Sequence, residues 1–171
     1  MANYCSYDMR IVGKKENVNE MIAMLKYDHP DGRHFYRVFS AGIYNAEERP
    51  DGRYVVDASG DCAWSVYSAM IEEEGYEKLC NVSGELELDI EVWSSEYGVG
   101  FQEHYIYSNG VEVESHCKDA TEYIMESLHE EYGTLEKANA ATNANFTKEE
   151  WDDVYFDVIR GGFDNYGTFS I

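Results

Sequence analysis

Four carboxylates alternate with four apolar side chains in one short stretch, and this pattern has the clearest chemical meaning in the sequence. The carboxylates are Glu85, Glu87, Asp89 and Glu91, and the apolar residues are Leu86, Leu88, Ile90 and Val92. Successive side chains of a β-strand point to opposite faces, so the alternation predicts a strand over residues 86–93 with one buried and one acidic face. Carboxylates two residues apart would stand about 6.5–7 Å from each other, similar to the spacing of phosphates along a nucleic-acid strand.

A row of negative charge of this kind is complementary to the basic groove of a nucleic-acid-binding protein. Glu112 and Glu114 alternate with valines and could extend the row, and the rigid rings of Tyr105 and Tyr107 could anchor the same interface. We therefore predict a partner-binding surface made of Glu85, Glu87, Asp89, Glu91, Glu112, Glu114, Tyr105 and Tyr107. The alternative is an ordinary solvated sheet face, although such faces mix both signs of charge and residues 85–91 contain no lysine.

The charge of the whole chain points the same way. It carries 34 acids against 13 bases, a net charge of −21. Residues 1–60 contain nine acids and eight bases, whereas residues 61–171 contain 25 acids and five bases. Affinity for nucleic acid rests on lysine and arginine, so we expect no direct binding of nucleic acid through the overall charge. Three explanations stay open at this point: solubility in a salt-rich environment, a cation-rich site, or a basic protein partner.

Targeting signals and metal motifs do not stand out. The N-terminus lacks the basic and apolar regions of a signal peptide, and no apolar run approaches the roughly 20 residues that span a membrane. The four cysteines are widely spread with no C-x-x-C pair, which favours reduced thiols. We therefore expect a cytoplasmic protein with no membrane partner, no metal and no cofactor.

Catalytic interpretations rest on weaker patterns. Asp57, Asp61 and Glu103, with His104, could meet in space and bind Mg²⁺ as in a metal-dependent nuclease. His116, Cys117 and His129 could form part of another metal site. The sequence has no EF-hand loop, P-loop, H-E-x-x-H motif or nucleophile elbow, so we assign no catalytic residue. A non-catalytic adaptor that associates through the hairpin and the aromatic tail, with Phe163 and Phe169, is a further alternative.

Hydrophobic periodicity predicts an α+β fold for residues 1–117. The expected elements are strands at 5–13, 35–44, 54–58 and 86–93, helices at 14–28 and 62–74, and a hairpin of strands 101–107 and 111–117. The hairpin turn is Asn109-Gly110, a strong hairpin signal. This order is the split βαβ pattern, which predicts a ferredoxin-like antiparallel sheet with helices on one face.

Residues 118–171 are expected to form a helical C-terminal extension that packs on this domain. Its two helices are predicted at 119–132 and 147–160, and the second begins with a capping box at Thr147 to Glu150. The remaining tail, 161–171, carries three aromatic residues.

Short motifs in residues 1–117 resemble the YubB-type proteins of phages and plasmids. The opening Asn3-Tyr4-Cys5-Ser6, followed by a strand ending Ile11-Val12-Gly13, resembles the start of these proteins. Tyr97-Gly98-Val99-Gly100-Phe101, Asn109-Gly110-Val111 and the position of Trp64 are similar to their ferredoxin-like domain. The resemblance implies a mobile-element setting, in which small acidic proteins counter host defence as anti-CRISPR or antirestriction proteins, and it supplies no catalytic residues.

The acidic row and this resemblance together predict an inhibitor that offers a nucleic-acid-like carboxylate surface to a CRISPR effector or a restriction enzyme.

Overall fold

The computed structural model describes residues 3–96, 101–118 and 128–152 of the chain. Several sequence predictions fall on the other residues and so lie outside the described part. They are the Tyr97–Gly100 motif, most of the helix predicted at 119–132, the later part of the helix predicted at 147–160, and the aromatic tail.

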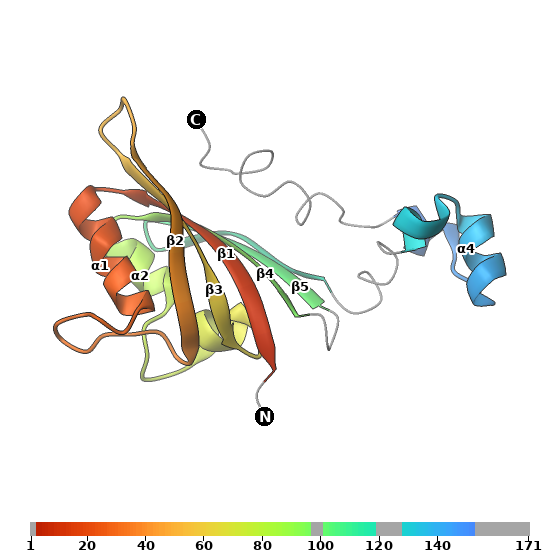
Figure 1. Ribbon diagram of the computed structural model, residues 1–171, viewed down its shortest axis with the longest axis horizontal. Helices are drawn as coiled ribbons and strands as arrows, with labels where there is room; N and C mark the ends of the chain where they lie inside the picture. The colour runs from red at the N-terminus through yellow and green to blue at the C-terminus, as the bar shows by residue number, and fades with distance from the viewer. Residues whose placement is uncertain (1–2, 97–100, 119–127, 153–171) are drawn as a thin grey trace.

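Six strands form one antiparallel sheet in the order β2-β3-β1-β4-β5-β6 (Figure 1). The strands are β1 (Tyr4–Gly13), β2 (Val38–Glu48), β3 (Tyr54–Ala63), β4 (Asp89–Glu96), β5 (Phe101–Ser108) and β6 (Val111–Lys118). All five neighbouring pairs are antiparallel. Within the described residues, strands β2 and β6 are therefore the two edges of the sheet. The mixed α+β class predicted from the sequence is confirmed.

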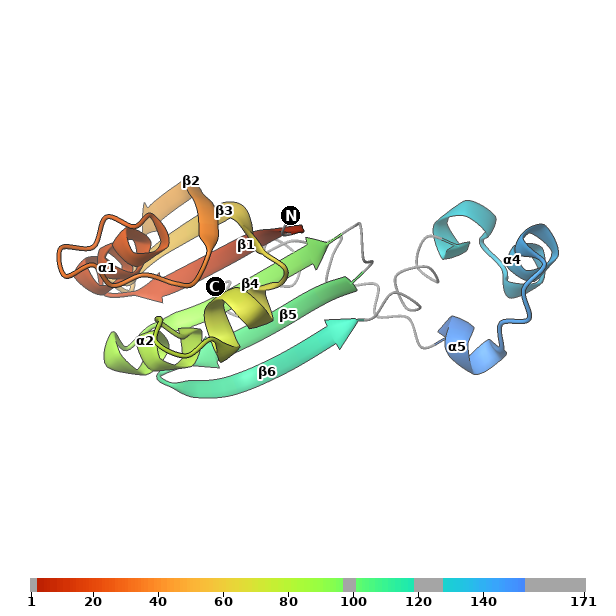
Figure 2. The same cartoon turned by 90° about the horizontal axis from the view of Figure 1, so that it is seen from below.

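Three helical segments cover one face of this sheet. They are α1 (Lys15–Leu25), the π-helix η1 (Tyr67–Glu72) and α2 (Leu79–Glu85), which lie in front of the strands in Figure 2. Helix α1 buries the residues that the helical spacing predicts, namely Val18, Met21, Ile22 and Leu25. Together with the facing side of β1, which carries Cys5, Tyr7, Met9 and Ile11, these residues belong to one hydrophobic core.

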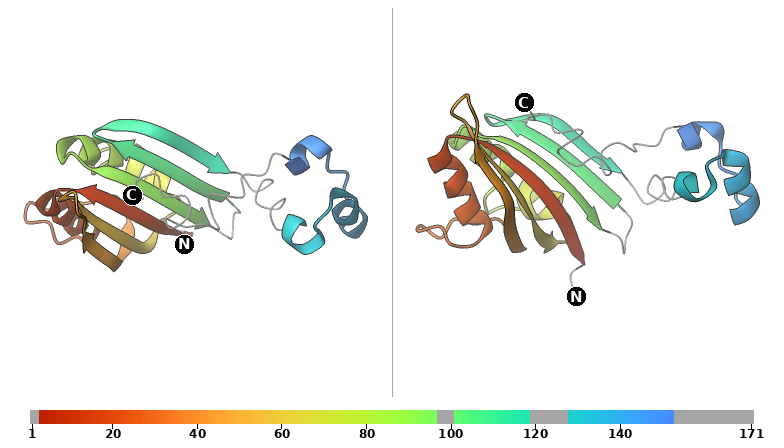
Figure 3. Two further views of the ribbon diagram at one scale, coloured as in Figure 1. Left: turned by 90° about the horizontal axis from the view of Figure 1, so that it is seen from above. Right: turned by 45° about the horizontal axis from the view of Figure 1, so that its top comes forward.

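The face of the sheet opposite α1, η1 and α2, seen in Figure 3, carries the other half of each strand's side chains. We call it the opposite face. It includes Arg10 on β1, Asp57 on β3, Glu91 on β4 and His104 on β5, which the pairing registers bring close to one another.

The strand predicted at 86–93 begins later than expected, because a helix precedes it. Residues 79–85 form α2, Leu86 caps this helix, and Glu87 has a left-handed backbone with φ of 53°. Strand β4 then starts at Asp89. The four apolar residues of the alternating pattern are nevertheless buried, as predicted: Leu86, Leu88, Ile90 and Val92. Leu86 is buried at the end of helix α2, and Leu88 is buried after the tight turn at Glu87. The predicted strand is therefore wrong for residues 86–88, whereas the predicted burial of Leu86 and Leu88 is right.

The helix predicted at 62–74 is also shorter than expected. Strand β3 continues through Ala63, well beyond the end predicted at Ala58. Trp64 then adopts φ of 67°, an unusual conformation for a large aromatic residue, and the helical part is confined to η1. A π-helix is rare and is often found at functional sites.

The predicted Asn109-Gly110 turn is confirmed, and it packs closely on α2. Asn109 and Gly110 have φ of 48° and 80°, as a turn of this type requires. A Cβ atom added to Gly84 of α2 would stand only 3.0 Å from the Gly110 Cα. The Ser83 hydroxyl accepts a hydrogen bond from the Gly110 amide at 3.1 Å and donates one to the Leu88 carbonyl at 2.7 Å.

The described C-terminal residues include α4 (Leu135–Thr142) and α5 (Lys148–Asp152). They form a small hydrophobic cluster of their own with Leu128, Ala138 and Trp151 at its centre. Helix α4 was not predicted, and its N-cap is the Thr134 hydroxyl, which accepts from the Lys137 amide. Helix α5 begins directly after Thr147, at the predicted start. The packing of this extension on the sheet stays a prediction, because residues 119–127 lie outside the described part.

Among the described residues, no helix has the length and apolar character needed to cross a lipid bilayer.

Candidate functional site

The four carboxylates of the alternating pattern do not form a row on one strand face. Glu85 ends α2, Glu87 lies in the following turn, and only Asp89 and Glu91 belong to β4. Exposure falls along the series, since Glu85 and Glu87 are exposed, Asp89 is half-buried and Glu91 has 0% of its surface exposed. The predicted phosphate-like spacing therefore does not exist, because the backbone changes from helix to strand within these seven residues.

Each of these carboxylates also has a partner within the chain. Arg33 contacts Glu85 at 2.7 Å, and Lys14 contacts Glu87 at 3.3 Å. Asp89 accepts a hydrogen bond from the Ser108 hydroxyl at 2.6 Å and lies 3.8 Å from the Arg53 guanidinium. The charge of the series is thus largely balanced locally.

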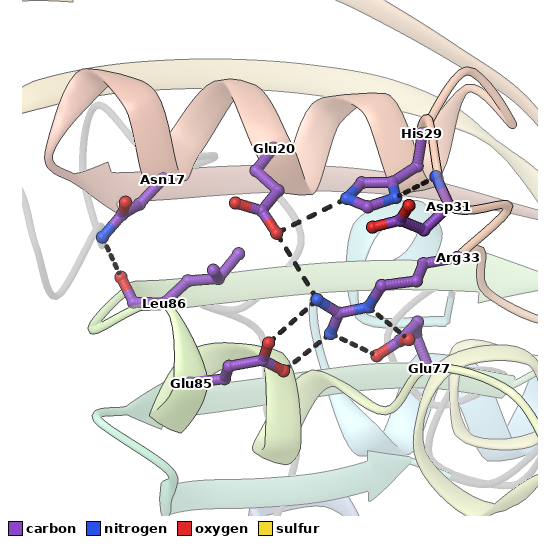
Figure 4. Close-up of polar contacts among 8 residues, drawn as sticks. All are labelled: Asn17, Glu20, His29, Asp31, Arg33, Glu77, Glu85 and Leu86. Atoms are coloured by element: carbon purple, nitrogen blue, oxygen red, sulfur yellow. Dashed lines mark hydrogen bonds and ion pairs between the residues drawn. The ribbon is translucent and has the colours of Figure 1, made fainter.

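Arg33 is the centre of the network that holds Glu85 (Figure 4). Its guanidinium donates to both oxygens of Glu77, at 2.8 and 3.1 Å, and to both oxygens of Glu85, at 2.9 and 2.7 Å. It also donates to Glu20 on α1 at 3.4 Å. The hydrogen bonds that Arg33 donates to these carboxylates, to Glu77 first and to Glu85 second, raise the pKa of Arg33 above its usual range. Arg33 therefore ties α1, α2 and the segment between η1 and α2 together.

Glu91 belongs to a buried polar network on the opposite face. It accepts hydrogen bonds from the Trp93 indole at 3.0 Å, and its Oε1 lies 2.8 Å from His104 Nε2. Beside it, Arg10 donates to both oxygens of Asp57, at 2.7 and 2.9 Å. A buried charged group is stable when it is paired or hydrogen-bonded, and each group of this network has such a partner, so the network has a structural explanation.

The hairpin holds the other four predicted contact residues, and it separates them into two groups. Tyr105 and Tyr107 are buried in the main core, where burial raises the pKa of each phenol, so neither is placed as a surface anchor. Glu112 accepts a hydrogen bond from the Tyr107 hydroxyl at 3.0 Å and is exposed. Glu114 lies 3.7 Å from His104 Nδ1 and is partly exposed.

Strand β6 is an edge strand that presents apolar as well as acidic side chains. Val111 and Val113 are 62% and 58% exposed, among the more exposed large hydrophobic residues in the described part of the chain. Val113 is the extra residue at a register shift, since Ile106 pairs with Glu114 and Tyr107 pairs with Glu112. A bulge of this kind changes the direction in which a side chain points. The edge from Val111 to Glu114 therefore exposes both valines, with Glu112 beside Tyr107 on the helix-covered side and the partly exposed Glu114 beside His104 on the opposite face.

The other edge, β2, differs in chemistry. Its exposed residues include Phe39 at 45%, Ile43 at 41% and Tyr44 at 58%. The Phe39 ring lies 5.1 Å from that of Tyr4, and the Arg37 guanidinium stands 6.0 Å from the Phe39 centroid. This edge therefore presents aromatic rings beside Arg37, which precedes the strand, and its two acids, Glu47 and Glu48, lie at its far end.

The predicted metal ligands are not brought together. Asp57 and Asp61 lie on the opposite face, where Asp57 binds Arg10 and Asp61 accepts from the Ser6 hydroxyl at 2.9 Å. Glu103 points to the helix-covered face. Cys117 pairs with Glu103 and His116 with His104, so these two neighbours point to different faces, while His129 stacks on Trp151 in the C-terminal cluster. Within residues 3–96, 101–118 and 128–152, no group of three or more His, Cys, Asp or Glu is arranged to hold a metal ion.

A cavity lies between η1 and the hairpin, next to β6. Its volume is about 450 Å³, and it is lined by Ser65, Tyr67, Phe101, Glu103, Tyr105, Ser115 and Cys117. Alternation places Phe101, Glu103 and Tyr105 on one face of β5, and Ser115 and Cys117 opposite them on β6. The sequence pattern could have shown this shared face. It could not have shown that Ser65 and Tyr67, at the start of η1, line the same cavity.

Comparison of the chain with protein-family models, with curated proteins and with solved structures finds no match.

Proposed function

We propose that this protein binds a basic, extended segment of a partner protein, which pairs with β6 as an additional strand. The observation that carries the proposal is the composition of the β6 edge, where exposed Val111 and Val113 alternate with Glu112 and Glu114. An edge strand offers unpaired backbone N–H and C=O groups to a second chain. In strand addition these groups supply the affinity, and alternate side chains supply the specificity.

Charge decides which of the two edges is the better candidate for a basic partner. Strand β6 contains two acids, Glu112 and Glu114, which flank the exposed Val113, and one base, Lys118, at its end. The β2 edge also carries two acids, Glu47 and Glu48, but Arg37 and Arg49 flank this strand, and the Arg49 guanidinium lies 3.9 Å from Glu47. A net charge of −21 would further accelerate the approach of a basic partner and make it sensitive to salt.

Acidic residues at a sheet edge also have a protective role, because they discourage pairing with other copies of the chain. This role accounts for Glu112 and Glu114 but not for the two exposed valines beside them. Aliphatic side chains at an edge favour pairing rather than prevent it. The combination is better suited to selective pairing with a basic strand.

The partner class stays the one that the sequence predicts, a basic nucleic-acid-binding protein such as a CRISPR effector or a restriction enzyme. Such proteins carry the lysine- and arginine-rich segments that contact phosphates. The proposed contact surface is narrower than the predicted one, since it uses the β6 edge in place of the series from Glu85 to Glu91. It requires no phosphate-like spacing of carboxylates.

We further propose that β1, α1, β2, β3, η1 and β4 form a ferredoxin-like unit to which the hairpin β5–β6 is added. Support comes from the antiparallel order β2-β3-β1-β4, with α1 in the connection from β1 to β2, and with η1 and α2 together in the connection from β3 to β4. In this view the hairpin is an addition that creates the β6 edge.

The test uses the full chain labelled with ¹⁵N and a short peptide in which lysine and valine alternate. The matched control peptide has glutamate in place of lysine. Strand addition predicts that the lysine peptide shifts or broadens the amide signals of β6 at low salt, and that the glutamate peptide does not. Equal effects of the two peptides, or effects centred on β2, would rule out the proposal.

Two pairs of variants separate a specific edge from general charge. Glu112→Lys with Glu114→Lys should weaken binding of the lysine peptide about tenfold, whereas Glu47→Lys with Glu48→Lys, the same change on the β2 edge, should leave it within about twofold after correction for salt. Val113→Lys should also weaken binding, and Ile43→Lys should not. Equal losses from both edges would indicate attraction to net charge alone.

A further inference from the structure

We propose that the cavity between η1 and the hairpin binds an organic cation, an ammonium or guanidinium group carried on an apolar stem. The proposal goes beyond the strand pairing described above, because it assigns a separate binding site with its own ligand chemistry. It rests on the charge of Glu103, the aromatic walls and the position of the mouth beside β6.

Glu103 brings a negative charge to the cavity without a cation to balance it. Only 3% of this residue is exposed. Its carboxylate accepts four hydrogen bonds, from the amides of Val66 at 2.9 Å and Tyr67 at 3.3 Å, and from the hydroxyls of Ser94 at 2.7 Å and Tyr105 at 3.0 Å. All four donors are uncharged, and within the described residues no Lys, Arg or His pairs with this carboxylate. A buried charge held only by neutral donors favours a cationic ligand nearby.

The walls of the cavity are suited to the rest of such a ligand. The rings of Tyr67, Phe101 and Tyr105 face a space of about 450 Å³, within the usual size of small-ligand sites. Aromatic faces attract ammonium and guanidinium groups and also pack against aliphatic stems. The Glu103 oxygens already accept four hydrogen bonds, so the ligand would not need to hydrogen-bond to them. The negative charge of Glu103 would attract the cation electrostatically at short range, and the aromatic rings would make the direct contacts.

The site is held in place by the backbone around it. Glu103 fixes the first amides of η1, and the chain enters this π-helix through Trp64, whose φ of 67° is sterically costly for an aromatic residue. The hydrogen bonds from Glu103 and the unusual backbone at Trp64 both lie in the short segment that contributes Ser65 and Tyr67 to the cavity. A cavity with walls that are fixed in advance loses little entropy when it binds a ligand.

The mouth of the cavity lies along β6, which contributes Ser115 and Cys117. The cation could therefore come from a free amine or guanidine, or from a lysine or arginine side chain of a segment paired with β6. The second source rests on the proposed function, and the first does not.

The test compares n-butylguanidinium with n-butylurea, a neutral molecule of nearly the same shape, on the full chain. Alkylation of the exposed Cys117 by iodoacetamide reports occupancy, because this thiol lines the mouth. We expect n-butylguanidinium to slow alkylation of Cys117 in a saturable manner, and n-butylurea to slow it at least tenfold less effectively at equal concentration. Equal protection by the two molecules, or none by either, would overturn the proposal.

Substitutions locate the binding site. Ser115→Lys places an ammonium group at the cavity, and Tyr67→Ala removes a ring that is 44% exposed, so each should weaken n-butylguanidinium about tenfold. Tyr67→Phe keeps the ring and should retain binding. Tyr76→Ala removes a tyrosine of similar exposure, 39%, from outside the cavity and should have no effect. If Tyr67→Ala and Tyr76→Ala act alike, the cavity is not the site.

The alternating lysine–valine peptide distinguishes the two sources. If n-butylguanidinium protects Cys117 but the peptide does not shift β6, the cation site stands and the strand pairing fails. If the peptide shifts β6 but neither Ser115→Lys nor n-butylguanidinium affects its binding, the strand pairing stands and no side chain of the paired segment enters the cavity. Competition between peptide and n-butylguanidinium would identify a side chain as the source.

Discussion

Arg33 and Glu85 are joined by two hydrogen bonds, with the guanidinium Nη1 2.9 Å and Nη2 2.7 Å from the two carboxylate oxygens. The same guanidinium also donates hydrogen bonds to both oxygens of Glu77. One cation therefore holds two carboxylates from different segments, and Glu85 is part of the internal structure although it is more than half exposed at its side chain, 55%.

Replacement of Arg33 by alanine should therefore destabilise the fold. The variant leaves Glu20, Glu77 and Glu85 close together without their cation, and we expect a loss of about 1–3 kcal/mol in the free energy of unfolding. Urea denaturation measures this loss. Arg33→Lys should recover only part of it, since an ammonium group lacks the planar pairs of donors with which Arg33 binds both oxygens of each carboxylate. Arg37→Ala is the control, because Arg37 is exposed and its guanidinium lies over the rings of Tyr36 and Phe39. Equal losses in both variants would contradict the role of Arg33.

Replacement of Asp8 by asparagine should stabilise the protein at neutral pH. Partial burial in the sheet, and then repulsion by the Asp57 carboxylate, raise the pKa of Asp8 above its usual value. The folded state therefore holds this proton more tightly than the unfolded state. The resulting stability is fully present below the unfolded pKa, about 3.9, and is lost as pH rises through the folded value. The gain from Asp8→Asn should be present at pH 7 and absent at about pH 3 in urea denaturation, whereas Asp28→Asn, an equally exposed position just after α1 and outside the sheet, should show no such difference.

Alkaline conditions should unfold the protein through its buried tyrosines. Burial is the main cause that raises the pKa of Tyr7, Tyr105 and Tyr107, so the folded state keeps three protons that the unfolded state releases near pH 10. Stability should therefore fall as pH rises above about 10. After a jump to alkaline pH, part of the tyrosinate absorbance should appear at once and the remainder at the rate of unfolding, measured in parallel by circular dichroism. Full ionisation before any loss of structure would show that these rings are accessible.

The four cysteines should differ strongly in reactivity. A hydrogen bond with Cys5, followed by burial, raises the pKa of Cys62, and both thiols lie in the core. The thiolate is the reactive form, so these two should resist a thiol reagent at neutral pH while exposed Cys117 reacts within minutes. Mass spectrometry after timed alkylation gives the order, and mild denaturant should release Cys5 and Cys62 together. Early modification of Cys62 in the native protein would be inconsistent with this core.

The elements with long, regular periodicity could be predicted from the sequence. The β1 alternation, the α1 spacing and the Asn109-Gly110 turn each combine a local preference with one buried face, and the structure agrees with all three. The order of the strands up to β4 was also predicted correctly, and a helical segment follows β3 as expected, but helix α2 before β4 was not predicted.

The series from Glu85 to Glu91 shows where the same reasoning fails. Burial of Leu86 and Leu88 is compatible with a strand of period two, but also with the end of a helix followed by a left-handed turn at Glu87. The sequence alone could not distinguish these, since Arg33, which holds Glu85, lies 52 residues away. For the same reason the cavity was not foreseen: its walls come from η1, β5 and β6, and only the tertiary fold brings Tyr67 to Glu103.

The close contact of Gly84 with Gly110 has a practical consequence for anyone who labels this protein. A turn of the Asn-Gly type is usually an obvious place for an epitope or a fluorophore, but here a bulky insertion would push α2 away from the hairpin and disturb β6 with it. The turn at Pro50-Asp51-Gly52 between β2 and β3 is the better place. All three residues are exposed, and within the described residues a Cβ atom on Gly52 would meet nothing closer than 4 Å.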